Sequence, residues 1–112
     1  MYIYACKLKR VIDGDTIKVD IDLGFHMWVK DVSIRFARIN TPEIRTRDKL
    51  EKARGYEAKH AVQEILENNP DELWIQVEKL GKYGRPIAEV FVGDDNVNDY
   101  LLEKGLAELV DY

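Results

Sequence analysis

The chain has 112 residues, of which 46% are hydrophobic and 34% charged, and its formal net charge is −4 at pH 7. This length allows one compact core and is too short for two ordinary domains, so we expect a single domain over residues 1–112. No run of about 18 apolar residues occurs and the first residues alternate in polarity, so the sequence predicts neither a membrane span nor a signal peptide. Cys6 is the only cysteine, which excludes an intrachain disulfide.

The acidic balance argues against a protein that coats nucleic acid without specificity, because such proteins are normally basic. The charges are unevenly distributed, however. Basic residues outnumber acidic ones over 35–54, a second basic group contains Lys79, Lys82 and Arg85, and the segment 94–111 is acidic. If the two basic groups meet in space they form an anion-attracting patch, and if they do not they are ordinary solvated faces.

Alternating polarity predicts two strands at the start of the chain, over 2–12 and 16–23, joined by a tight turn at 13–15. A third, longer strand is expected over 28–39, which is rich in β-branched and aromatic residues. Pro42 then forbids continuation as a central strand. The first two strands therefore form a predicted hairpin.

Residues 44–54 are highly charged, which predicts an exposed loop or a frayed lead-in to a helix over 56–67. Gly55 marks the start of that helix or a kink. The rest of the pattern predicts strands over 73–80 and 87–92, a short helix over 97–104 and a final extended or irregular segment over 106–110.

Consecutive strands are mostly joined by tight turns, which only antiparallel pairs permit. Five short strands with a helix after the third favour a small Greek-key barrel of the oligonucleotide-binding (OB) type over a parallel α/β sheet. The predicted fold is therefore mainly β with two helices, a five-stranded OB-type barrel.

Two polar stretches that interrupt the strands carry residues suited to phosphodiester hydrolysis, which needs neutralised phosphate charge, a positioned water and usually a divalent metal. Asp15 and Asn40 offer hard oxygen ligands of the kind that calcium prefers, and the backbone carbonyl of Thr41 offers a third. Glu43, just beyond a proline corner, can orient or deprotonate a water. These residues predict a metal-assisted site.

Arg35 and Arg85 can clamp a phosphate bidentately, a geometry that lysine does not reproduce. Each feature alone has an ordinary explanation. The Asp-Gly-Asp sequence at 13–15 is a common turn, Thr-Pro-Glu at 41–43 often starts a helix, and 81–85 can be a simple hairpin connection. Their joint occurrence in this order, with strand-like runs between them, favours a phosphate site.

Three stretches together resemble the motifs of the staphylococcal nuclease family. They are Val11-Ile12-Asp13-Gly14-Asp15-Thr16, Ile34-Arg35 followed by Asn40-Thr41-Pro42-Glu43, and Lys82-Tyr83-Gly84-Arg85. The similarity continues at 97–98 and 105–107 and covers nearly the whole chain. The resemblance implies a calcium-dependent nuclease on an OB-type barrel that cuts DNA and RNA with little sequence preference and leaves 3′-phosphate ends.

Carried over residue by residue, the resemblance makes Asp15 a metal-binding aspartate, Arg35 and Arg85 phosphate-clamping arginines and Glu43 the catalytic glutamate. A separate pair matches residues near the bound nucleotide, namely Lys82 and Tyr83.

Two departures from the family pattern affect these expectations. Asn40 stands where the best-known member has a second metal-binding aspartate, so we expect weaker calcium binding or another divalent metal preference. The chain also stops at Tyr112, roughly where that member continues into a third helix. We interpret this as a natural short form or as a helix whose packing role a partner subunit fills.

Other residues fit a functional role less well. Arg38 falls where an apolar strand residue is expected, and structural or interface use is favoured over a further phosphate ligand. Trp28 and Trp74 can stack on bases, but large apolar side chains in strands more often belong to the core. Tyr83 is the aromatic residue that we expect to contact a base or sugar.

The principal alternative to a nuclease is a non-catalytic nucleic-acid-binding barrel, because the same fold binds oligonucleotides without cutting them. Such a module would have lost some charged members of the set, whereas Asp15, Arg35, Glu43 and Arg85 are all present. A scaffold barrel of a phage or mobile-element particle is a third interpretation, and it predicts a fixed oligomer indifferent to calcium. We expect a DNA or RNA partner and no membrane, favour a cytoplasmic or mobile-element origin, and leave a homo-oligomer open.

Overall fold

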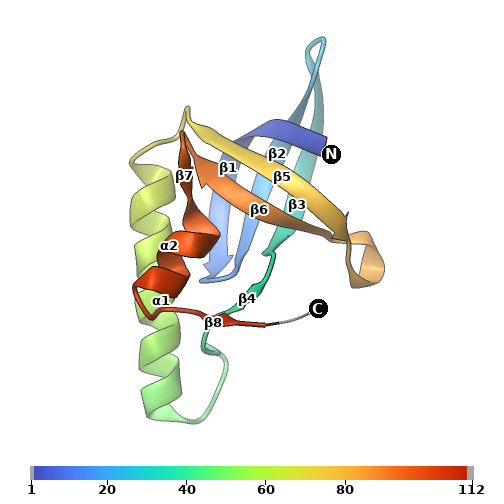
Figure 1. Ribbon diagram of the computed structural model, residues 1–112. Helices are drawn as coiled ribbons and strands as arrows, with labels where there is room; N and C mark the ends of the chain where they lie inside the picture. The colour runs from blue at the N-terminus through green and yellow to red at the C-terminus, as the bar shows by residue number, and fades with distance from the viewer. Residues whose placement is uncertain (1, 111–112) are drawn as a thin grey trace.

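The computed structural model describes residues 2–110, except the side chain of Tyr83. Within this part, strands joined mainly in antiparallel register close into a barrel, and the order along the sheet is β3-β2-β1-β5-β6 with an additional pairing between β3 and β6 (Figure 1). The five barrel strands are β1 (Tyr2–Asp13), β2 (Thr16–Gly24), β3 (Met27–Phe36), β5 (Leu73–Leu80) and β6 (Pro86–Val92).

The closing contact is a short parallel pairing in which Arg35 lies opposite Ile87 and Phe36 opposite Ala88. It is supplemented by a hydrogen bond of 2.8 Å from the backbone N–H of Ala37 to the carbonyl of Ala88. The architecture is therefore the OB-type barrel with two helices that the sequence predicted.

The remaining elements lie outside the barrel wall. Figure 1 shows α1 along one side of the barrel with α2 beside it, and the turn η1 on the opposite side. Their bounds are β4 (Ile39–Asn40), α1 (Lys49–Glu67), η1 (Lys82–Gly84), β7 (Asp95–Asn96), α2 (Val97–Glu103) and β8 (Glu108–Leu109).

The core sits inside the barrel and between the barrel and the two helices. Strand alternation places Ile17, Val19 and Ile34 inward, where they are fully buried, as the sequence pattern predicted. Helix α1 adds Val62 and Leu66, which are also fully buried. One face of α1 is thereby fixed against the barrel, and with it the segment that precedes the helix.

Helix α1 begins at Lys49, so of the two alternatives predicted for 44–54 the loop is correct only up to Asp48, and residues 49–54 lead into the helix as its first turns. The Asp48 carboxylate caps the helix, since its Oδ1 accepts from the backbone N–H groups of Leu50 at 3.0 Å and Glu51 at 3.2 Å. The first turns are highly charged because they extend beyond the end of the barrel into solvent (Figure 1). Polarity there reflects exposure and not the absence of a helix.

Strand β3 ends at Phe36, so the predicted strand over 28–39 is too long. Arg38 adopts a left-handed backbone with φ 67°, which ends the strand ladder and turns the chain into β4. Strand β4 pairs with β8, and the N–H of Val110 bonds the carbonyl of Arg38 over 2.7 Å. This turn brings Asn40 and Thr41 back toward the start of β2.

The described part of the chain contains no helix that is both long and apolar enough to cross a membrane.

Candidate active site

The carboxylate of Asp15 is held at the start of β2 by contacts from both sides. Its Oδ1 accepts a hydrogen bond from the hydroxyl of Thr16 at 3.2 Å, and its Oδ2 accepts one from the backbone N–H of Thr41 at 3.1 Å. Both Asp15 and Thr41 are buried. The carboxylate thus ties the β1–β2 turn to the segment after β4 and has little freedom to move.

The guanidinium of Arg35 bridges two oxygens from different parts of the chain. Its Nη1 lies 3.1 Å from Oδ2 of Asp15 and 3.3 Å from the Asp15 carbonyl oxygen. Its Nη2 lies 3.2 Å from Oδ1 of Asn40. The pairing of Thr16 with Arg35 across β2 and β3 sets this arrangement, because paired residues project to the same side of the sheet.

The position of the Arg35 guanidinium indicates whether the oxygens of Asp15 and Asn40 suit a metal ion. A positively charged group already lies between the Asp15 carboxylate and the Asn40 amide oxygen, so the two oxygens are oriented toward a cation. Hard oxygens of this kind suit calcium or magnesium. No cluster of three or more His, Cys, Asp or Glu side chains able to hold a metal occurs within residues 2–110, and Asp15 is the carboxylate in the group formed with Arg35 and Asn40.

Glu43 lies on the rim of a cleft of about 600 Å³ that Asn40 and Thr41 also line. The Glu43 side chain is exposed, and its backbone N–H donates to Oε2 of Glu51 over 3.1 Å. Glu51 belongs to the first turn of α1, so the helix start fixes the backbone that carries Glu43. The sequence analysis did not identify Glu51 as part of the site. Asp48 followed three residues later by Glu51 is, however, a recognisable pattern for the start of a helix.

Two glycines allow α1 to approach the site segments closely. A Cβ on Gly55 would lie 2.7 Å from the carbonyl oxygen of Pro42 and 3.0 Å from that of Glu43. A Cβ on Gly14 would lie 2.7 Å from the Cβ of Ala58. Gly55 therefore lies inside α1 at a packing position, so the alternative that it starts the helix is wrong.

The third motif lies on the η1 turn, just before the strand β6 that pairs with β3 at Arg35. Lys82 and Arg85 are exposed at the η1 turn, which Figure 1 shows on the side of the barrel away from α1. The structure joins Asp15, Arg35 and Asn40 directly, whereas Glu43, Lys82 and Arg85 have exposed side chains on other segments. The side chain of Tyr83, expected near a bound nucleotide, lies outside the described part.

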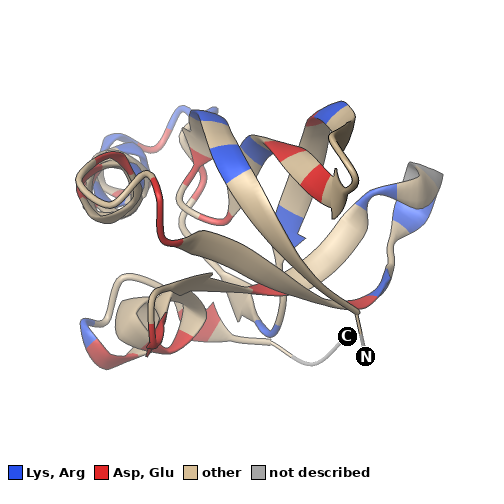
Figure 2. Cartoon of the chain, turned by 90° about the horizontal axis from the view of Figure 1, so that it is seen from above, with Lys and Arg blue, Asp and Glu red and all other residues tan. Residues whose placement is uncertain are grey.

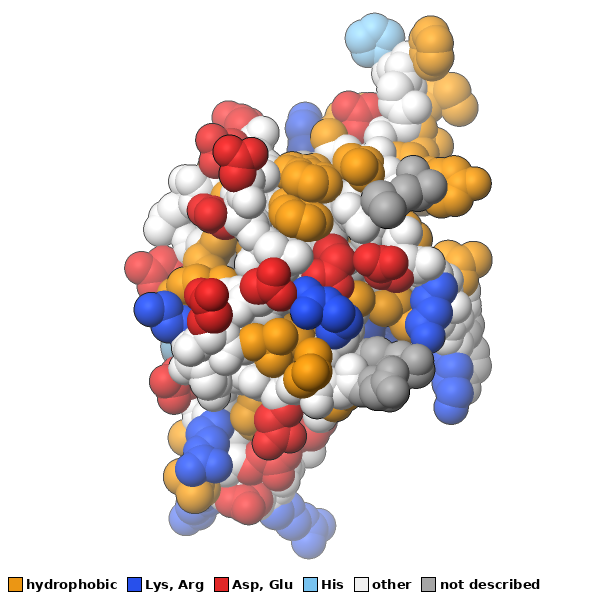
Figure 3. All heavy atoms as spheres, in the orientation of Figure 1, with side chains coloured by type: hydrophobic (Ala, Val, Ile, Leu, Met, Phe, Trp, Pro, Cys, Tyr) orange, Lys and Arg blue, Asp and Glu red, His pale blue; other side chains and the backbone are white. Residues whose placement is uncertain are grey.

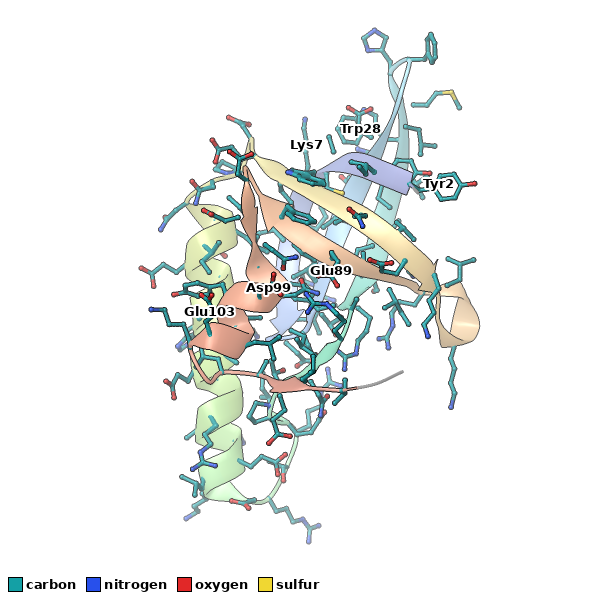
Figure 4. All side chains as sticks on the ribbon, viewed as in Figure 1. Tyr2, Lys7, Trp28, Glu89, Asp99 and Glu103 are labelled. Carbon is teal, nitrogen blue, oxygen red and sulfur yellow. The ribbon has the colours of Figure 1, made fainter. Side chains whose placement is uncertain are left out.

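The side chain of Arg38 binds two carboxylates, those of Glu89 and Asp99. Its Nε donates to Oε2 of Glu89 at 2.9 Å, and its Nη2 contacts Oδ1 of Asp99 at 2.7 Å. Asn96 donates a further hydrogen bond to Glu89 over 2.9 Å. These carboxylates raise the pKa of Arg38 above its ordinary value. Figure 4 shows Glu89 and Asp99 close together, from β6 and α2, so Arg38 joins the end of the barrel to α2.

The fold and this geometry define the class as an OB-type barrel domain with a carboxylate, an arginine and an amide gathered at one end. A family model described as "Staphylococcal nuclease homologue" matches residues 33–112. The chain belongs to the staphylococcal nuclease family.

Individual relatives agree with this assignment. The chain is 35% identical to "Thermonuclease" of Staphylococcus intermedius over 100 residues, which cover 89% of this chain and 56% of the relative. It is 33% identical to "Endonuclease YncB" of Bacillus subtilis (strain 168) over 105 residues, which cover 91% of this chain and 46% of the relative. The chain therefore spans about half the length of these relatives.

Proposed function

We propose that this chain is a nuclease that hydrolyses phosphodiester bonds of DNA, RNA or both, with the help of a divalent cation. The observation that carries the proposal is the Arg35 guanidinium held between the Asp15 carboxylate and the Asn40 amide oxygen, with Glu43 on the adjoining rim. Relatives named as a thermonuclease and an endonuclease support the same reaction class.

Asp15, Asn40 and the carbonyl of Thr41 are the residues that we propose to hold the cation, with calcium as the first candidate. The oxygen donor set suits it, and the single carboxylate leaves another divalent metal open. When bound, a divalent cation neutralises charge on the phosphate and polarises a phosphoryl oxygen. The buried position of Asp15 and its two hydrogen bonds keep the carboxylate oriented for this role.

Arg35 and Arg85 donate to the phosphate oxygens and stabilise the charge that develops there. Glu43 accepts a proton from the attacking water, whose oxygen forms the new bond to phosphorus. The bond from phosphorus to the 5′-oxygen breaks, and that oxygen takes up a proton, which leaves a 3′-phosphate end. Arg85 lies two residues before Ile87, the strand partner of Arg35, and its side chain is exposed, which supports its assignment to the same phosphate.

Little sequence preference follows from the same set of residues. Arginine contacts to phosphate and a glutamate contact to water position the backbone of the nucleic acid and do not read base edges. Lys82 and Tyr83, on the η1 turn, are the residues that we propose to lie beside the nucleotide next to the cleaved bond.

Digestion of heat-denatured DNA tests the proposal, with calcium in one sample and a calcium chelator in the other. We expect loss of substrate only with calcium and fragments with 5′-hydroxyl ends, which accept phosphate from a polynucleotide kinase without prior dephosphorylation. Arg35→Ala and Glu43→Ala should each lower turnover by orders of magnitude while circular dichroism stays unchanged. Glu57→Ala, an exposed change on α1, serves as the control.

Two results would contradict the assignment. Unchanged rates in both the Arg35 and Glu43 variants would exclude the proposed site. A retarded DNA band without digestion, in calcium, magnesium and manganese alike, would favour the non-catalytic binding module instead.

A further inference from the structure

The outward face of the β1–β3 half of the barrel carries basic side chains that the proposed reaction does not use. Because Ile17, Val19 and Ile34 point into the core, their sequence neighbours on the strands point outward. Figure 2 shows Lys and Arg bands on the strands, with Asp and Glu bands among them. We call this surface the basic face, and its members are Lys7, Lys9, Arg10, Lys18 and Lys30.

The basic face is continuous with the proposed phosphate site. Thr16 pairs with Arg35 and Lys18 pairs with Ser33, so Lys18 lies one step along the same face from Arg35. Arg10 pairs with Lys18 on the other side, which extends the row of cations onto β1. A chain of phosphates that leaves Arg35 therefore meets Lys18 and Arg10 next.

One carboxylate in the middle of this face is already neutralised. Asp20 is 4% exposed and lies 3.6 Å from Nζ of Lys9 and 3.4 Å from Nζ of Lys30. The backbone N–H of Asp31 donates to it over 3.0 Å and is the main reason that the pKa of Asp20 is lowered. Asp20 thus holds two lysines in place and does not repel an anion from the rest of the face.

The remaining basic side chains are available to an anion. Within the described residues, Arg10 and Lys18 form no salt bridge, and Nζ of Lys7 lies over the ring of Trp28. The body of the protein is acidic, with a net charge of −4, and Figure 3 shows acidic side chains gathered over α2. The basic face is therefore a local group of cations on a molecule of negative net charge, and such a group can attract a polyanion.

Trp28 supplies an aromatic surface among these cations. Nζ of Lys7 lies 5.0 Å and Nζ of Lys30 lies 5.4 Å from the centre of its ring. The side chain is half-buried on the outside of the barrel, so the expected core position is wrong for this tryptophan. Figure 4 shows Lys7 and Trp28 next to each other on the upper part of the barrel.

The spacing of these groups suits a strand of several nucleotides. From Arg35 to Trp28 the strand β3 advances by seven residues, about 23 Å at roughly 3.3 Å per residue. OB-type barrels that bind single strands engage about 4–16 nucleotides, with phosphates on cations and bases stacked on aromatic rings. Stacking on Trp28 requires an open base face, which a duplex does not offer.

We propose that the basic face binds the single-stranded DNA or RNA that flanks the cleaved bond. Phosphates lie on Lys18, Arg10 and Lys7, and a base stacks on Trp28. The inference rests on the proposed nuclease function, because it treats the face as an extension of that site. It makes long strands better ligands than short ones.

Fluorescence anisotropy with labelled oligothymidylates of 4 and 16 nucleotides tests the inference, in a chelator so that no cutting occurs. The double variant Arg10→Gln/Lys18→Gln should bind the 16-mer about tenfold more weakly, and the slope of log K against log salt should fall by about 1.4 for two lost phosphate contacts. Lys52→Gln/Lys104→Gln removes the same charge from other faces and should bind as the unchanged chain does.

Trp28 is tested separately through its fluorescence in a Trp74→Phe background, where it is the only tryptophan. Quenching by the 16-mer supports stacking, and no change of emission overturns that part. Equal affinity of the Arg10→Gln/Lys18→Gln variant and the unchanged chain for the 16-mer overturns the inference, even if the protein cuts DNA. Weakened binding by that variant in a protein that does not cut supports the basic face while the nuclease proposal fails.

Discussion

The Nη2 atom of Arg35 donates a hydrogen bond to Oδ1 of Asn40 over 3.2 Å. The contact orients the amide oxygen of Asn40, and not its nitrogen, toward the Arg35 guanidinium, which also pairs with the Asp15 carboxylate. A neutral amide can therefore take part in a cation site, although it brings no charge of its own.

Asn40→Asp should tighten calcium binding by roughly tenfold, because a second carboxylate raises the ligand charge while the oxygen position is kept. The new carboxylate also pairs with Arg35, but a divalent ion gains more from it than a monovalent guanidinium does. Isothermal titration calorimetry with calcium measures the difference. Asn68→Asp adds the same charge at the distant end of α1 and should leave the affinity unchanged. Equal or weaker binding by Asn40→Asp would contradict the charge argument.

Gly55→Ala should lower activity and stability together. Alanine normally stabilises a helix interior by about 1 kcal/mol relative to glycine. Here the added Cβ would lie 2.7 Å from the Pro42 carbonyl oxygen, so the backbone that carries Glu43 must move. We expect a net loss of about 1–3 kcal/mol, the usual range for overpacking. Thermal unfolding and the DNA digestion assay measure the two effects.

The control for this change is Lys52→Ala, an exposed substitution in the same helix. It should leave the activity and the melting temperature nearly unchanged. A Gly55→Ala variant that is more stable and fully active would contradict this prediction. It would show that the backbone at Pro42 and Glu43 can move to accommodate the Cβ without loss of stability or activity.

The strands could be predicted from sequence because their pattern is local. Ile17, Val19 and Ile21 alternate with polar residues, and each is buried as that alternation requires. Residue types and the order of the motifs placed Arg35 and Asp15 in one phosphate site, but the way in which the two side chains meet could not be predicted from them. In the structure, this contact depends on the register of β2 with β3, which pairs Thr16 with Arg35. The register between two strands cannot be predicted from the sequence of either strand alone.

Features that depend on distant contacts could not be predicted. The start of α1 has no core face, so only Asp48 and Glu51 signalled it. Arginine seldom adopts a left-handed backbone, and Arg38 does so in a structure where Glu89 and Asp99, far along the chain, bind its side chain. The parallel pairing that closes the barrel likewise joins segments about fifty residues apart. Tight turns predict only the pairing of strands that follow each other in the sequence, so they did not predict this contact.

Arg38→Ala should destabilise the protein, because it leaves the Glu89 carboxylate, whose side chain is 9% exposed, without its main partner. Removing one member of a fully buried ion pair costs about 3–5 kcal/mol, and we expect about 1–3 kcal/mol here because the Arg38 side chain is 41% exposed. Denaturant unfolding measures the loss. Arg47→Ala, an exposed change in the loop before α1, is the control.

A second substitution that removes the unpaired charge of Glu89 tests whether that charge causes the loss of stability. Adding Glu89→Gln to Arg38→Ala removes the unpaired charge and should recover part of the lost stability. A double variant as unstable as the sum of the two single changes would show that Arg38 acts through packing and not through Glu89.

Cys6 should be unreactive in the folded protein. It is 6% exposed, and burial, with a smaller contribution from the charge of Asp22, raises the pKa of its thiol from 9.0 to about 12. The thiolate is the reactive form, so it is scarce at pH 8. A colorimetric thiol reagent at pH 8 should label Cys6 at the rate of global unfolding, and at once in denaturant. Fast labelling of the native protein would contradict the buried position.

The same thiol makes stability depend on pH in a defined window. A pKa that is higher in the folded state means that the unfolded chain loses the proton first, so the contribution is complete below pH 9.0 and is lost as the pH rises toward about 12. Cys6→Ala removes this titration while keeping a small apolar side chain. The stability difference between the two proteins, measured by denaturant unfolding at pH 8 and at pH 10.5, should therefore shift in favour of Cys6→Ala at the higher pH. A difference that stays constant between the two pH values would show that the thiol titrates equally in the folded and unfolded chains.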